Sequence, residues 1–170
     1  MRLRSRIANL RTNHLFARFR HSVQSAKAHG LGVIHYSLQG DHIHMIVEAE
    51  NTTSLASGMK SFGARFAKAV RRKIGGKGSI FNGRYHAHIL KTPTEMKRAL
   101  LYVLTNISKH DRLIAYIDHF SSGFAFKEWR KLAGKVWNGL LEELAERRRD
   151  HTELTNARSW LAREGWMRVR

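Results

Sequence analysis

The sequence of 170 residues has no cysteine, a single proline and few acidic residues, with 13 Asp and Glu against 31 Lys and Arg. The lack of cysteine excludes disulfide bridges, thiolate zinc sites and a cysteine nucleophile. The scarcity of carboxylates disfavours a hydrolase cleft built from acidic side chains. The chain also lacks a run of about 18 apolar residues, and its basic start has no secretory apolar run. These absences predict a cytoplasmic protein without a membrane partner.

The positive charge is the strongest feature that is present. The net charge is +18, and hydrophobic residues make up 42% of the chain, which is enough for a folded core. Residues 1–140 carry a net charge of +17, whereas residues 141–170 carry +1. A polyanion, and nucleic acid first, is therefore the expected partner of the first 140 residues.

The hydrophobic pattern predicts alternating helices and strands. Helices are expected at about 12–29, 54–74, 92–109 and 127–149, with a short one around Trp160 and Trp166, and strands at 33–38, 42–48 and 84–91. The third helix has the clearest start, because Thr92 can cap it, Pro93 suits its first turn and Glu95 completes a capping box.

The order of these elements suits an α+β fold, namely a ferredoxin-like split βαβ antiparallel sheet with helices on one face. No full strand precedes the first helix, and only residues 1–4 can supply a remnant of one. Two parts are expected: residues 1–126 as the main domain and residues 127–170 as a C-terminal helical extension packed on it.

Two His-x-His pairs are candidates for chemistry. His42 and His44 fall on one face of a predicted strand, as a divalent metal site requires. His86 and His88 repeat the spacing, which shows that such pairs arise easily among 11 histidines. The alternative interpretation, for either pair, is that the histidines lie on the surface or face DNA.

Tyr102 and Asn106 are four residues apart, so they are neighbours on one helix surface. A tyrosine hydroxyl can attack a phosphodiester and form a covalent phosphotyrosine. The amide oxygen of Asn106 can complete a metal site. The alternative interpretation is a half-exposed tyrosine beside a surface asparagine.

Taken together, these motifs resemble one family. The segment 35–47, HYSLQGDHIHMIV, is similar to the His-x-His strand of the single-tyrosine HUH transposases, in particular the branch of REP-associated tyrosine transposases. FNGRYHAH at 81–88 resembles the block before their catalytic helix, and LYVLTN at 101–106 resembles their Tyr-x-x-x-Asn helix. The resemblance covers residues 1–126 and resumes near 158.

The resemblance implies a function and a site. His42, His44 and Asn106 would bind Mg²⁺ or Mn²⁺, and Tyr102 would be the nucleophile that nicks and rejoins single-stranded DNA through a 5′-phosphotyrosine. The phosphotyrosine conserves the bond energy, so no nucleotide cofactor is needed. The expected partner is single-stranded or hairpin DNA. Expected DNA contacts are Lys60, Arg71, Arg72, Lys73, Lys77, Arg84, His86, His88, Arg98 and Lys109.

Two other functions stay open at this point. Members of the family begin with a full strand, so this chain is also consistent with a catalytically inactive, DNA-binding remnant of a transposase. A replication-initiator-type HUH nickase would use the same chemistry. The sequence does not distinguish a monomer from a dimer.

Overall fold

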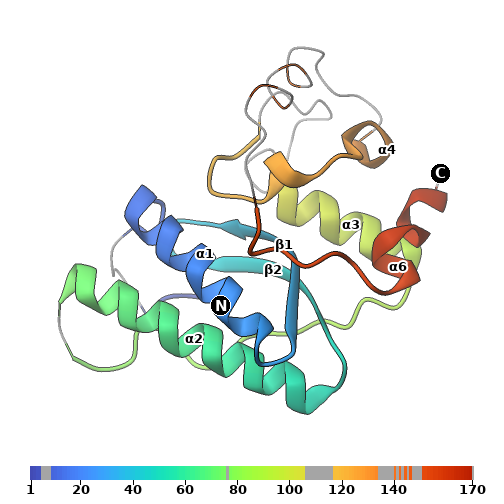
Figure 1. Cartoon of the computed structure of the whole chain (residues 1–170). Helices are drawn as coiled ribbons and strands as arrows, with labels where there is room; N and C mark the ends of the chain where they lie inside the picture. The colour runs from blue at the N-terminus through green and yellow to red at the C-terminus, as the bar shows by residue number, and fades with distance from the viewer. Residues whose placement is uncertain are drawn as a thin grey trace.

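The computed structural model describes residues 1–4, 9–75, 77–105, 117–133, 140, 142, 144, 146 and 151–169 (Figure 1). The elements in chain order are α1 (Asn13–Lys27), β1 (Leu31–Leu38), β2 (Ile43–Ala49), α2 (Thr52–Ile74), α3 (Pro93–Leu104), η1 (Gly123–Ala125), α4 (Trp129–Ala133), α6 (Trp160–Arg163) and η2 (Gly165–Arg168). The protein is thus of mixed α+β structure, as the sequence predicts. Within the described residues, no helix combines the length and the apolar character needed to cross a membrane.

Side-chain caps fix the starts of the three long helices. Thr12 caps α1, and Asn51 caps α2 by accepting a hydrogen bond from the Ser54 amide at 2.8 Å. Both halves of the predicted capping box at Thr92 and Glu95 are present at the start of α3. Caps of this kind satisfy amides that the first helical turn leaves without partners. The sequence prediction of α3 is therefore confirmed at its N-terminus.

The sheet is an antiparallel pair that short contacts extend on both sides. β1 and β2 pair from Leu38↔Ile43 to Leu31↔Ala49, with an irregularity between Val33 and His35. Residues 1–3 continue the sheet beyond β2 through the bridges Arg2↔His42 and Leu3↔Phe81. The N-terminal remnant expected from the sequence therefore does lie beside the strand that carries the His-x-His pair.

Helices cover both faces of the sheet, so the prediction of helices on one face is wrong. α1 and α2 pack in a first core with β1 residues such as Tyr36, and α3, η1 and α4 pack in a second core with Ile34 and Ile46 (Figure 1). β1 is buried along almost its whole length, which is typical of a strand covered on both sides. Trp129 is buried in the second core.

Two predicted elements differ in the structure. Residues 84–91 form no strand, because no described backbone group pairs with them, although the side chains alternate as in a strand. Of the helix predicted at 127–149, the described part consists of α4 and the helical residues 140, 142, 144 and 146. The end predicted for the third helix at about 109 lies outside the described residues, since α3 is described to Leu104.

Candidate active site

The first part of the candidate site is the start of β2. Ile43 and Met45 face the first core, so the alternation of the strand directs His44 to the opposite face, toward α3. His42 lies just before β2, and its ring centroid is 4.7 Å from that of His44, with the planes at 82°. The two imidazoles are therefore neighbours on one face, as the spacing of the motif predicts.

The second part is α3, which presents Tyr102. The buried side of α3 consists of Met96, Leu100, Val103 and Leu104. Tyr102 lies off this stripe, and 41% of its surface is exposed. Its hydroxyl is 3.2 Å from Nε2 of His44, and the two rings meet edge to face with centroids 4.7 Å apart. Tertiary packing thus joins two motifs that are 58 residues apart in the sequence.

Asp41 is a part of the site that the motifs do not include. Its carboxylate forms a hydrogen bond with Nδ1 of His42, and Arg2 lies 3.5 Å from its other oxygen. The hydrogen bond with His42 holds the pKa of the Asp41 carboxyl below its usual value. When Nδ1 of a neutral histidine donates to a carboxylate, Nε2 becomes the nitrogen that can accept a proton or bind a metal. The adjacency of Asp41 and His42 in sequence is the only signal that could have revealed this contact.

The donor chemistry of His42 and His44 fits a divalent metal ion. Imidazole suits first-row transition metals, and Mg²⁺ prefers oxygen, so the pair favours Mn²⁺. Asn106, the third ligand that the resemblance implies, lies outside the described residues. Among the residues that are described, no group of three or more His, Cys, Asp or Glu side chains is arranged to hold a metal ion. The described part of the site therefore offers two adjacent imidazole side chains that could serve as nitrogen ligands.

The predicted DNA contacts are spread over several elements. Arg98 is exposed on α3, one turn before Tyr102, so the two side chains share one surface. Lys109 lies outside the described residues. The other predicted contacts are exposed on α2 and on the loops after it, namely Lys60, Arg71, Arg72, Lys73, Lys77, Arg84, His86 and His88. Arg71 also donates a hydrogen bond to the Gly78 carbonyl at 2.7 Å, which ties the end of α2 to the following loop.

The second His-x-His pair is not part of the site around Tyr102. His86 and His88 are exposed in the segment that forms no strand, and Nε2 of His88 lies 3.9 Å from a carboxylate oxygen of Glu95. The His-x-His spacing of His86 and His88 is therefore not sufficient to form a second site like that of His42 and His44. This outcome agrees with the interpretation of these residues as surface histidines.

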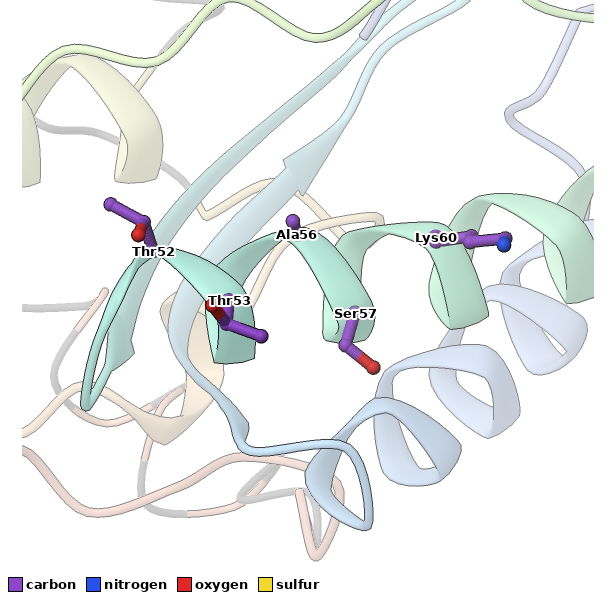
Figure 2. Close-up of a pocket in the computed structure, with 5 residues that line it drawn as sticks. All are labelled: Thr52, Thr53, Ala56, Ser57 and Lys60. Carbon is purple, nitrogen blue, oxygen red and sulfur yellow. The ribbon is translucent and has the colours of Figure 1, made fainter.

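A pocket of about 480 Å³ lies elsewhere, along the N-terminal half of α2 (Figure 2). It is lined by Thr52, Thr53, Ala56, Ser57 and Lys60. Lys60 is the only lining residue among the predicted DNA contacts, and none of His42, His44 and Tyr102 lines the pocket. The candidate active site lies instead between β2 and α3, where the Tyr102 side chain is exposed.

A buried polar cluster is the largest feature that sequence reasoning missed. Glu153 is 3% exposed, and Arg20 donates to its two oxygens at 2.9 and 2.8 Å. Tyr36 donates to Glu153 at 2.6 Å, and Nδ1 of His151 lies 2.9 Å from the same oxygen. Burial acts to raise the pKa of Glu153, but the hydrogen bonds with His151, Arg20 and Tyr36 lower it to about 2. The cluster fastens the C-terminal segment to α1 and β1.

Comparison of the chain with protein-family models, with curated proteins and with solved structures finds no match in any of the three.

Proposed function

We propose that this protein is a metal-dependent, single-stranded DNA endonuclease and strand transferase of the transposase type, with Tyr102 as its nucleophile. The observation that carries the proposal is the position of the Tyr102 hydroxyl, 3.2 Å from Nε2 of His44 and beside the paired ring of His42. A hydroxyl nucleophile within hydrogen-bond reach of an imidazole is the arrangement that covalent catalysis requires.

In the proposed reaction, Tyr102 attacks the scissile phosphorus in line. A bond forms between the Tyr102 oxygen and phosphorus, and the bond from phosphorus to the 3′ oxygen breaks. The tyrosine proton is released to solvent, and the departing 3′ oxygen takes up a proton from solvent to become a 3′-OH. The products are a 5′-phosphotyrosine and a free 3′-OH, and the reverse attack by another 3′-OH rejoins the strands. No energy source is consumed, because one phosphodiester replaces another.

His42, His44 and Asn106 are the residues that would hold the metal. When bound, a divalent cation acts as a Lewis acid toward the scissile phosphate. Asp41 supports this role by holding His42 through Nδ1. Nε2 of His44 can serve Tyr102 or the metal but not both at once, so we expect Tyr102→Phe to bind Mn²⁺ at least as tightly as the wild type.

The charge of the protein supports a nucleic-acid substrate. The net charge of +18 attracts a polyanion, and Arg98 stands one turn from Tyr102 on the exposed side of α3. An arginine at this distance can hold a phosphate close to the nucleophile.

The test is formation of a covalent adduct with a hairpin oligonucleotide that carries a single-stranded flank and a 3′ fluorescent label. The 3′ fragment keeps the 5′-phosphotyrosine, so the label should migrate with the protein on a denaturing gel when Mn²⁺ is present. Tyr102→Phe should give no adduct. Tyr85→Phe, a half-buried tyrosine packed against the first core, should react as the wild type does. An adduct that survives in Tyr102→Phe would overturn the proposed mechanism.

A DNA-binding protein without nuclease activity is the second candidate function. It is favoured by the net charge of +18, because charge alone is sufficient for DNA binding and requires no catalytic site. This candidate predicts salt-sensitive DNA binding that does not change in the double variant His42→Ala and His44→Ala. It also predicts no retained metal, so Mn²⁺ that is bound by the wild type and lost from the double variant would count against it.

A further inference from the structure

Trp160 is an exposed aromatic side chain that the proposed site does not use. Three large hydrophobic side chains are exposed among the described residues, namely Ile89, Tyr102 and Trp160, and 47% of the Trp160 surface is accessible. Six residues later, Trp166 is 2% exposed and packs on Phe126 in the second core. The C-terminal segment therefore buries one tryptophan and leaves the other on the surface.

Gly165 and Arg168 hold the Trp160 ring in place. A Cβ atom added to Gly165 would lie 2.7 Å from Cζ3 of Trp160, so only glycine allows the backbone to pack this closely on the ring. The guanidinium of Arg168 lies over the same side chain, 5.7 Å from the ring centroid. A cation near an aromatic ring is favourable in itself, and arginine also attracts phosphate. The ring is thus a fixed surface next to a positive charge.

The helix that carries Trp160 is anchored to both β2 and α3. Glu48, on the same strand as His44, accepts hydrogen bonds from the Arg158 amide at 2.8 Å and from the amide and hydroxyl of Ser159. The hydroxyl of Ser159 in turn caps α6. Just after η2, the Val169 carbonyl accepts a hydrogen bond at 2.9 Å from Lys97 on α3. α6 therefore lies beside α3, the helix that carries Tyr102 (Figure 1).

The local charge identifies the kind of ligand. From Arg158 to the end, the chain has four arginines and one glutamate, although residues 141–170 as a whole are close to neutral. Arg158, Arg163 and Arg168 are all exposed. An exposed indole among arginines is the combination by which proteins bind single-stranded nucleic acid, where a base stacks on the ring and cations attract the backbone.

We propose that Trp160 is a stacking platform for an unpaired nucleobase of single-stranded DNA. Arg168 and the neighbouring arginines attract the phosphates of the same strand. The platform deepens the proposed function, because it adds a binding site for the single strand beside α3. It does not depend on cleavage, since stacking requires neither Tyr102 nor a metal.

The test is equilibrium binding in EDTA, measured by fluorescence anisotropy with two labelled 12-mers. One is oligo(dT), and the other has abasic sites at every position, so that it keeps the phosphates and loses the bases. The wild type should bind oligo(dT) more tightly by roughly 5- to 150-fold, the range that stacking of one base gives. Trp160→Leu should lose most of this preference and bind the abasic strand within about twofold of the wild type. Trp160→Phe should keep part of the preference, because an aromatic ring remains.

Ile89→Ala is the matched control, because it removes an exposed hydrophobic side chain from another part of the surface. It should leave both affinities unchanged. The proposal is wrong if Trp160→Leu retains the wild-type preference for oligo(dT). It is also wrong if this substitution lowers the affinity for oligo(dT) and for the abasic strand by the same factor. It is also wrong if oligo(dT) and its duplex with oligo(dA) bind equally well, since a paired base cannot stack on the ring. Failure of the adduct test with Tyr102 would leave these binding results unaffected.

Discussion

The hydroxyl of Tyr102 and Nε2 of His44 are 3.2 Å apart, on the surface between α3 and β2. A contact at an exposed position contributes little to stability, so we propose that the Tyr102 hydroxyl lies beside His44 for catalysis and not for folding. This distinction can be measured.

We expect Tyr102→Phe to change the free energy of unfolding by less than ~0.5 kcal/mol, because the side chain is exposed. Tyr36→Phe is the matched comparison, since the Tyr36 hydroxyl is buried and donates to Glu153. Its loss should cost ~1–3 kcal/mol, because a buried carboxylate loses a partner. Urea denaturation measures both. An equal loss in the two variants would show that the Tyr102 hydroxyl has a structural role.

Glu153 should make the protein less stable in acid. Its pKa is about 2 in the folded protein against an ordinary value of 4.5, so the unfolded chain binds the proton first as the pH falls. The stabilisation is complete above pH 4.5 and is lost between pH 4.5 and about 2. The difference in unfolding free energy between the wild type and Glu153→Gln should therefore shrink over this window. Glu142→Gln, at an exposed position, should show no such trend.

His35 should contribute a second acid-sensitive window at higher pH. Burial, together with the nearby His151, lowers the pKa of His35 to about 4 from an ordinary value of 6.5. Because the unfolded chain is protonated first, stability falls as the pH drops from 6.5 to 4 and then levels off. His35→Gln should flatten this part of the stability curve. If the exposed-site control His29→Gln flattens it equally, the assignment to His35 fails.

The side chain of Thr92, which caps α3, should stabilise the protein more than the side chain of Thr94 in the same turn. Thr92→Ala removes the acceptor for the Glu95 amide and should cost ~1 kcal/mol. Thr94→Ala, an exposed residue in the same turn, should cost less than ~0.5 kcal/mol. Thermal and urea denaturation give both values. Equal costs would mean that the capping box adds nothing to helix stability.

The end of α2 should contribute to DNA binding through charge. Arg72 and Lys73 are exposed in its last turn, and each phosphate contact with a single strand gives a salt slope of roughly 0.7. The double variant Arg72→Ala and Lys73→Ala should therefore reduce the slope of log K against log salt by roughly 1.4. The double variant Arg130→Ala and Lys131→Ala makes the same change of charge on α4. An equal loss of slope in both would indicate a general charge effect.

Local structure was largely predictable from the sequence, because its causes lie within a few residues. The capping box at Thr92 joins residues three apart, and the β1–β2 hairpin joins neighbouring strands. Residues 84–91 show the limit of this reasoning. Their side chains alternate as in a strand, but a strand also needs a hydrogen-bonding neighbour, and no described backbone group provides one.

The sequence by itself determined the charge, the capping box of α3 and the direction of the His42 and His44 rings, since each follows from composition or from residues a few positions apart. Tertiary structure alone decided which residues meet across long distances: Tyr102 with His44, and Arg20 with Glu153, which is 133 residues away. It also decided that Trp166 is buried while Trp160 is exposed. Two tryptophans six residues apart have the same hydrophobicity, and only the shape of the packed core determines which of them it can enclose.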